Sequence, residues 1–313
     1  MENKCLYCYG PIERGKDFHE KCSLAFFGTP TPPRIEYSLD QMDELAKNVV
    51  ERSVAVPGVQ PKLSMSLVAE STNLTHARLT IMGALGGNYI FKPPSDRFPE
   101  MPENEHVSMR MAESFGIPAA PSSLIRLASG EIGYITKRID RTDKGEKIHM
   151  LDMFQITEAF DKYKSSMEKV GNALDAYSNN PLLDKTYFLD LTLFSFLTGN
   201  NDMHLKNFSM MENPSGWVLA PAYDLLNVAI VFPEDQEELA LTLSGKKKKL
   251  KREHFEQLGE GLGLSPKQIR GTFNRALKNK PKALSLIDQS FLSENMKTAY
   301  REILSKRYGR LKE

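Results

Sequence analysis

The residues best suited to chemistry lie in one short segment, LTGNNDMHLKNFSM (197–210). Asp202 and Asn207 are five residues apart there, directly after a long apolar stretch. A phosphotransferase needs a carboxylate that orients the acceptor hydroxyl and accepts its proton. It also needs an amide oxygen that binds Mg²⁺ on the nucleotide phosphates. A loop lets both side chains face one cleft, which a regular helix does not at this spacing. The pair therefore predicts a phosphoryl-transfer site.

A second carboxylate, Asp224, lies in APAYDLLN (220–227). Two short strand patterns precede it, around 207–211 and 217–219, and a hairpin there would return Asp224 to the same cleft. Oxygen ligands of this kind suit Mg²⁺. Taken singly, each carboxylate has a local explanation: Asp202 as a loop residue at a helix end, and Asp224 as a helix N-cap. Taken together with a lysine, they favour phosphoryl transfer.

That lysine is Lys92, a lone cation at the end of the apolar run NYIFK (88–92). It is either a solvated strand end or a point charge that reaches nucleotide phosphates. Glu105 opens a predicted helix and can pair with Lys92 and orient it. The alternative is that Glu105 only complements the helix dipole.

The segment VPGVQPKLS (56–64) is a turn that enters a predicted strand. Gly58 permits close approach of the backbone, and neighbouring N–H groups can cradle phosphate. The spacing is not that of a P-loop, so the signal is weak by itself and also fits an ordinary turn.

The three cysteines all lie in the first 22 residues, and with one histidine they form Cys5-x₂-Cys8-x₁₀-His19-x₂-Cys22. This is the ligand count and paired spacing of a structural Cys₃His zinc site, in which four protein ligands leave no open position. The alternative is that three reduced thiols pack as small hydrophobic groups.

The segment SGKKKKLKRE (244–253) carries six positive charges between Lys246 and Arg252. It fits a solvated loop before a helix, or a surface that docks on an acidic partner or on DNA within a repressor complex. Without interleaved aromatic residues, stacking on single-stranded nucleic acid is not expected.

The composition is that of an ordinary globular protein. The 313 residues include 41 Lys and Arg against 40 Asp and Glu, a formal charge of +1, which argues against a dedicated nucleic-acid binder. The N-terminus has no apolar signal core, and no apolar stretch approaches the roughly 20 residues that span a bilayer. Few cysteines and no disulfide pattern suggest a reducing cytoplasm.

The elements that must position these residues change type along the chain. An amphipathic helix is predicted at 38–53 with Ser38 as its N-cap. Strand patterns follow at 62–67, 77–83, 88–92, 122–127 and 133–138, with one helix at 103–116. Beyond residue 140 a buried helix is predicted at 181–199, and helical periodicity runs from 251 to the end. We expect a small segment at 1–28, a β-rich lobe at 29–140 and a helical lobe at 141–313.

In order and spacing these segments resemble the HipA-like Ser/Thr kinases of bacterial toxin–antitoxin systems. The resemblance covers roughly residues 53 to 310 and rests on GVQPK (58–62), YIFKP (89–93), NEH (104–106), KRIDR (137–141), LDMFQ (151–155), GNNDMHLKNFS (199–209) and PAYDLL (221–226). It implies an α+β, bilobal, protein-kinase-like fold, with one helix in a β-rich N-lobe and a mainly helical C-lobe.

The resemblance also implies a role for each matching residue. Asp202 would be the catalytic base, and Asn207 and Asp224 would hold Mg²⁺. Lys92 would contact the phosphates of ATP, with Glu105 in the same ATP site. The segment covering the phosphates would comprise Gly58, Val59, Gln60 and Lys62, and the hinge that receives adenine through backbone groups would lie near Lys137 and Arg138.

Two departures from the family bear on regulation. Full-length members carry roughly a hundred more residues before the glycine motif, whereas Gly58 here follows 57, as in short HipT-like toxins whose missing subdomain is a separate protein. Members often have Ser or Thr just before that glycine, where autophosphorylation inactivates the kinase. Here the residues are Ala55, Val56 and Pro57, and Ser53 is the nearest hydroxyl. We therefore expect inhibition by a separate partner.

The resemblance points to an ATP-dependent Ser/Thr protein kinase that acts on a cellular protein. Its expected partners are a HipB-like helix-turn-helix repressor, a HipS-like small protein, or both, with DNA reached only through a partner. Two alternatives remain open: a small-molecule or lipid kinase on the same scaffold, and a catalytically silent binding module or co-repressor.

Overall fold

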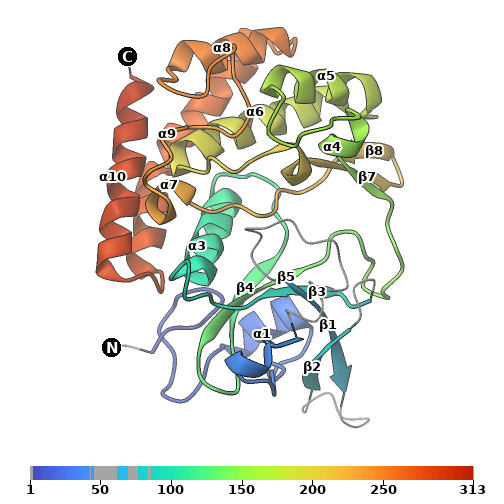
Figure 1. The fold of residues 1–313 in the computed structure, drawn as a ribbon, viewed down its shortest axis with the longest axis vertical. Helices are drawn as coiled ribbons and strands as arrows, with labels where there is room; N and C mark the ends of the chain where they lie inside the picture. The colour runs from blue at the N-terminus through green and yellow to red at the C-terminus, as the bar shows by residue number, and fades with distance from the viewer. Residues whose placement is uncertain (1–2, 43, 46–61, 70–76, 83–85, 313) are drawn as a thin grey trace. The chain divides into compact units, whose positions relative to one another are not determined.

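A computed structural model describes residues 3–42, 44–45, 62–69, 77–82 and 86–312. The chain forms two compact units. Unit 1 comprises Met1–His106, Ala120–Glu146 and Gln289–Phe291, and unit 2 comprises Val107–Ala119, Lys147–Asp288 and Leu292–Glu313. The division falls inside helix α3, Met101–Ser114 (Figure 1).

Unit 1 contains a five-stranded antiparallel sheet in the order β2-β1-β3-β5-β4. The strands are β1 (Leu63–Ala69), β2 (Ala77–Ile81), β3 (Tyr89–Lys92), β4 (Ser122–Arg126) and β5 (Ile132–Lys137). All five strand predictions are confirmed. Alternate residues such as Leu63 and Met65 are buried, as the two-residue period of a strand requires.

The first 28 residues of unit 1 share their core with this sheet. Helix α1 (Glu20–Phe27) ends at Gly28, whose φ of 78° is the left-handed conformation that glycine adopts easily. Phe26 and Phe27 of α1 belong to the same apolar cluster as Leu63 and Phe91 of the strands. Residues 1–28 therefore contribute to the core of unit 1 and do not form one of their own.

The predicted helix at 38–53 is described only in part. Residues 39–42 and 44–45 are helical, and the Ser38 hydroxyl accepts a hydrogen bond from the Gln41 N–H at 3.4 Å. Met42 is fully buried in the core of unit 1. The rest of this prediction, residues 46–53, lies outside the described residues.

Unit 2 is mainly helical, with a small antiparallel sheet in the order β6-β7-β8. Its strands are β6 (Met150–Asp152), β7 (Ser209–Asn213) and β8 (Gly216–Leu219). Its helices are α4 (Met153–Ile156), α5 (Met167–Tyr177), α6 (Pro181–Thr198), the 3₁₀ turn η1 (Leu205–Asn207), α7 (Val228–Val231), α8 (Arg252–Gly261), α9 (Pro266–Gln289) and α10 (Glu294–Arg310) (Figure 1).

Helix α6 is the centre of unit 2 and explains where the loop after it lies. It packs against α5, α8, α10 and β8, and its second half is almost entirely buried. Proline at its first position and Gly199 at its C-cap set its limits. At Gly199, with φ 74°, a Cβ atom would lie 2.6 Å from Asn227 Oδ1, so glycine is required at this turn. No helix within the described ranges is both long enough and apolar enough to cross a bilayer.

The basic run before α8 is partly neutralised within unit 2. Lys247 Nζ lies 3.1 Å from Glu237 Oε2, and Arg252 Nε donates to Glu256 at 2.7 Å. Lys246 Nζ lies 3.3 Å from His254 Nε2. These contacts favour the prediction of a solvated loop at a helix start over that of a free basic patch.

Candidate active site

In unit 1 the predicted pairing of Lys92 with Glu105 is present. Lys92 Nζ donates to both carboxylate oxygens of Glu105 at 2.8 Å. The two side chains are only 12% and 3% exposed, and the Tyr134 ring centroid lies 5.5 Å from the ammonium. A charge this buried needs a partner, so strand β3 and helix α3 together fix one cation at a defined point.

Most of the residues predicted to cover the phosphates lie outside the part of the chain that the structure describes. Gly58, Val59 and Gln60 lie outside the described residues. Lys62 is exposed, directly before β1. Its role at a phosphate stays a prediction.

Lys137 and Arg138, the residues predicted near the hinge, use their backbone N–H groups inside unit 1. The Lys137 N–H donates to Pro121 O at 2.9 Å and the Arg138 N–H to Asn88 O at 2.8 Å. The Lys137 ammonium lies 5.9 Å from the centroid of the Phe26 ring. An adenine held near these residues would therefore have to use other backbone groups.

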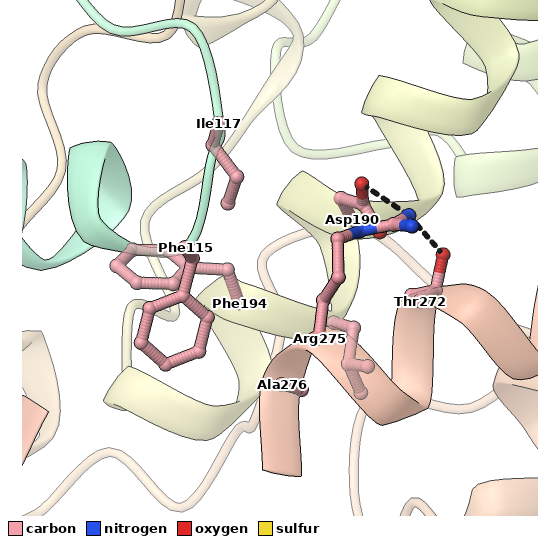
Figure 2. A pocket seen from close by; sticks show the side chains of 8 residues that line it. Phe115, Ile117, Asp190, Phe194, Thr272, Arg275 and Ala276 are labelled. Atoms are coloured by element: carbon pink, nitrogen blue, oxygen red, sulfur yellow. Dashed lines mark hydrogen bonds and ion pairs between the residues drawn. The ribbon is translucent and has the colours of Figure 1, made fainter. Parts of the chain in front are cut away.

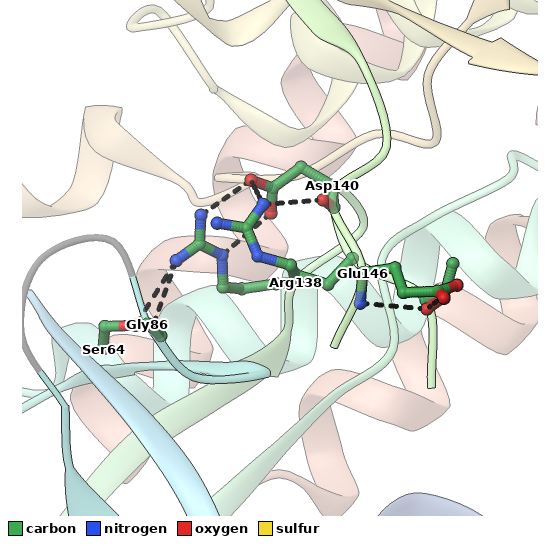
Figure 3. A network of polar contacts seen from close by, with 7 residues as sticks. Ser64, Gly86, Arg138, Asp140 and Glu146 are labelled. Carbon is green, nitrogen blue, oxygen red and sulfur yellow. Dashed lines mark hydrogen bonds and ion pairs between the residues drawn. The ribbon is translucent and has the colours of Figure 1, made fainter. Parts of the chain in front are cut away.

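The Arg138 side chain belongs to the polar network of Figure 3. Its guanidinium makes two contacts with the Asp140 carboxylate, at 2.8 and 2.6 Å, and a third with Gly86 O at 3.2 Å. Arg141 also donates to Asp140. Burial would raise the pKa of Asp140, but the two arginines lower it overall. The Arg138 side chain therefore has a structural role: it connects the end of β5 with the segment before β3.

In unit 2 the loop after α6 brings Asp202 and Asn207 together. Asn207 Nδ2 donates to the backbone oxygen of Asp202 at 3.0 Å, and the side chain of Asn207 is buried at the end of η1. This contact uses the amide nitrogen and leaves the amide oxygen as the atom suited to a cation. The His204 N–H also donates to Asp202 O, at 2.8 Å, and fixes the turn between them.

Asp224 follows the β7–β8 hairpin, and its neighbour Tyr223 contacts the loop that carries Asp202 and Asn207; a shared cleft stays a prediction. Burial lowers the pKa of His204, and the negative charges of Asp202 and Asp224 oppose that shift. Asp224 has a φ of 60°, which is uncommon outside glycine and is often found at functional sites. Next to it, the Tyr223 hydroxyl donates to Lys206 O at 2.9 Å and holds the segment against η1.

One contact of the candidate base could not be predicted from any sequence motif. Tyr163, in the loop between α4 and α5, donates its hydroxyl to Asp202 Oδ1 at 2.8 Å. Its ring packs edge-on against His204, with centroids 5.0 Å apart. Burial, and then the charge of Asp202, raise the pKa of Tyr163, so its hydroxyl stays protonated. A residue 39 positions away becomes a neighbour only through the fold.

The four predicted metal ligands also come together, in unit 1. One ligand atom each from Cys5, Cys8, His19 and Cys22 lies within 4.8 Å of all the others. His19 Nδ1 lies 3.4 Å from Cys8 Sγ and 3.6 Å from Cys22 Sγ. Its Nε2 lies 2.9 Å from Pro11 O, the backbone contact that commonly orients a metal-bound imidazole. The donor set fits a tetrahedral metal ion.

Two cavities of unit 2 do not include these residues. One, of about 10 Å³, lies beside the Asp190–Arg275 ion pair, between Phe115 and Thr272 (Figure 2). That volume holds no more than about one water molecule. The other, of about 230 Å³, is bordered by Tyr187 and Ala222 among others. Neither cavity is lined by Asp202, Asn207 or Asp224.

Comparison with known proteins agrees with the motifs. The HipA-like C-terminal domain family matches residues 54–284. A Haemophilus influenzae protein named "Putative kinase" is 25% identical over 275 residues, 78% of this chain and 78% of that protein. The serine/threonine-protein kinase toxin HipA of Shewanella oneidensis is 24% identical over 255 residues, 74% of this chain and 57% of that protein.

A solved structure extends the likeness to the fold. HipA in the Shewanella oneidensis MR-1 complex of HipA, HipB and operator DNA superposes with a TM-score of 0.68. The match is 23% identical and covers 85% of this chain and 70% of that one. The predicted α+β, protein-kinase-like fold is confirmed.

Proposed function

The chain belongs to the HipA-like C-terminal domain family, and on that premise we propose that it is an ATP-dependent Ser/Thr protein kinase. It would transfer the γ-phosphate of ATP to a hydroxyl of a cellular protein. Kinase-named relatives and the kinase-like fold support the reaction class. The choice of Ser or Thr is drawn from the HipA toxin.

The observation that carries the proposal is the contact of Asp202 with a hydroxyl. Oδ1 of Asp202 accepts a hydrogen bond from the Tyr163 hydroxyl at 2.8 Å. A general base in phosphoryl transfer must make this contact with the acceptor hydroxyl. In the proposal, the substrate hydroxyl takes the position of the Tyr163 hydroxyl, and Asp202 orients it and accepts its proton.

The remaining residues would position the nucleotide. Mg²⁺, when bound, neutralises charge that develops on the phosphates. Asp224 and the amide oxygen of Asn207 would hold it, and Lys92, oriented by Glu105, would contact the phosphates. The segment with Gly58 would cover them. Asn207 is buried and Lys92 is nearly so, and each is held by hydrogen bonds, which suits positioning without large rearrangement.

We further propose that the Cys5, Cys8, His19 and Cys22 cluster binds one structural zinc ion. Three thiolates and one imidazole are the ligands that zinc prefers, and the His19 contact with Pro11 supports the required tautomer. Three free cysteines, the thiols of this cluster, suit a cytoplasmic location, where thiols stay reduced.

Partner binding follows the same premise. We propose that the kinase is a toxin held inactive by an antitoxin, either a HipB-like helix-turn-helix protein or a HipS-like small protein. The structure of a relative with HipB and operator DNA supports this context. DNA would be reached only through such a partner.

The test is nucleotide binding measured by calorimetry with and without Mg²⁺. The wild type should bind ATP more tightly with Mg²⁺. Asp224→Ala should lose that gain, on the order of 10-fold or more, because it removes a charged metal ligand. Asp175→Ala, on an exposed carboxylate of α5, is the matched control and should bind as the wild type does. A wild type that binds no ATP would refute the proposal.

A further inference from the structure

The turn that carries the first two metal ligands has a fixed backbone. The Cys5 N–H donates to Gly10 O at 2.9 Å, and the Tyr9 N–H donates to Cys5 O at 3.0 Å. Tyr9 itself has a φ of 64°, a conformation that costs free energy for a bulky side chain and persists only where the surroundings hold it. Tyr9 directly follows Cys8 and its N–H is bonded to Cys5, so the positions of these two cysteines help to set the position of Tyr9.

Tyr9 connects this turn to helix α3. The Tyr9 hydroxyl lies 2.8 Å from His106 Nδ1, and the two rings pack edge-on with centroids 5.2 Å apart. Tyr9 is 3% exposed and His106 is fully buried. A buried hydrogen bond between residues 97 positions apart fixes the distance between two elements that the local sequence does not relate.

His106 follows Glu105 in α3, and Glu105 holds Lys92. Both contacts of that ion pair are 2.8 Å long and involve both carboxylate oxygens. Because both side chains are largely buried, they have little freedom to change rotamer, and a shift of the α3 backbone would weaken these contacts. The path from metal ligand to phosphate lysine therefore runs from Cys8 through Tyr9, His106 and Glu105.

We propose that the Cys/His cluster, loaded with a divalent ion of the zinc class, holds the Lys92–Glu105 pair in its nucleotide-binding geometry through Tyr9 and His106. Tyr9 and His106 are positioning residues, since neither is placed at the reacting atoms. The effect on nucleotide affinity rests on the proposed role of Lys92 in ATP binding. The effect on the first two turns of α3 does not depend on that role.

The test uses the full chain with Tyr9→Phe, which removes one hydroxyl and retains the ring. Elemental analysis should still find about one zinc per chain. Hydrogen exchange of the amides at 103–106, read by mass spectrometry, should become faster than in the wild type. Affinity for Mg²⁺–ATP should fall about 2- to 10-fold, the range expected for loss of one buried hydrogen bond. Tyr37→Phe, a partly buried tyrosine of the same core, is the control and should change none of the three.

Removing the metal from the wild type with a chelator should reproduce the faster exchange at 103–106. Removing it from Tyr9→Phe should add little there, because the same connection is already broken. The inference is overturned if Tyr9→Phe keeps wild-type exchange at 103–106, or if the purified chain binds no metal. If exchange responds as expected but the wild type binds no ATP, the coupling stands and the proposed kinase function fails.

Discussion

The candidate residues of unit 1 and those of unit 2 are held in different ways. In unit 1 the candidate phosphate lysine, Lys92, is locked in a buried ion pair with Glu105. In unit 2 the candidate base, Asp202, lies in a loop, where its carboxylate accepts a hydrogen bond from a neutral tyrosine hydroxyl and its backbone oxygen accepts one from the Asn207 amide. The Lys92 ammonium is paired with a carboxylate of opposite charge, whereas the hydrogen bond to the Asp202 carboxylate comes from an uncharged hydroxyl.

Because of this difference, substitutions of the two groups of residues should affect the stability of the fold and the rate of the reaction to different extents. Removing one member of the Lys92–Glu105 pair strands a charge in a buried position, which is costly. Removing the Asp202 carboxylate strands no charge, so the fold should tolerate it. Substitutions of Lys92 or Glu105 should therefore change both folding and binding, and substitutions at Asp202 should change the reaction alone.

The largest effect is expected for Asp202→Ala. Phosphoryl transfer should fall by about 10²- to 10⁴-fold, the usual contribution of a positioned base. ATP affinity and the melting temperature should stay close to wild type, because the carboxylate faces the acceptor. A transfer assay with calorimetry on the same samples measures both, and a variant that retains most wild-type turnover would contradict the assignment.

Glu105→Ala should destabilise unit 1 by about 3–5 kcal/mol, the usual cost of leaving a buried charge unpaired. Denaturant unfolding gives this value. Glu131→Ala is the control, since Glu131 is a partly buried glutamate directly before β5 whose carboxylate is bonded to the Ser129 hydroxyl. The double variant Lys92→Met with Glu105→Leu should regain much of the loss because no charge remains buried. Equal stability of the single variant and the wild type would show that the pair is not a buried ion pair in solution.

Glu103 lies two residues before Glu105 on the same helix. Burial governs the pKa of Glu103, whereas Glu105 is paired with Lys92. Burial, with a smaller effect of nearby Glu100, raises the pKa of Glu103 to about 7. Between about pH 4.5 and pH 7 the folded protein keeps this proton and the unfolded chain releases it, so the free energy of unfolding should fall as the pH rises through that window. Glu103→Gln should flatten this part of the pH profile of unfolding. An unchanged slope would place Glu103 in a more solvated position.

The smallest effect is expected for Tyr163→Phe. Without its hydroxyl, Asp202 is open to water or to a substrate hydroxyl, so phosphate release from ATP in water should rise a few-fold. Tyr177→Phe, on an exposed tyrosine of α5, should leave the rate unchanged. A fall in the rate for Tyr163→Phe would mean that the tyrosine orients Asp202 for catalysis and does not compete with the acceptor.

The sequence predicted well wherever a pattern is local. Alternation along 62–67 and 88–92 gave strands β1 and β3, and apolar residues on most sides of 181–199 gave the buried helix α6. The ligand spacing from Cys5 to Cys22 also predicted a real cluster, because a tight turn and one helical turn fix both ligand pairs locally.

Contacts that depend on the tertiary fold escaped prediction. Tyr163 is hydrogen-bonded to Asp202, and Tyr9 to His106, but no sequence motif predicts either pair. The resemblance placed Arg138 near the hinge that receives adenine. It did not predict that the Arg138 side chain is hydrogen-bonded to Asp140. The basic run fitted either a solvated loop or a docking surface in the sequence, and acidic partners such as Glu237, which come from outside the run, could not be predicted from it.

The central claim is most directly tested with Asp202→Asn, which keeps the shape of the side chain and removes its charge. Wild type and variant are incubated with Mg²⁺ and ATP labelled at the γ-phosphate, together with a bacterial lysate as the source of acceptors. The account predicts labelled Ser or Thr residues on lysate proteins with the wild type, and none above background with a folded variant that still binds ATP. Absence of labelling by the wild type, or equal labelling by the variant, would contradict it.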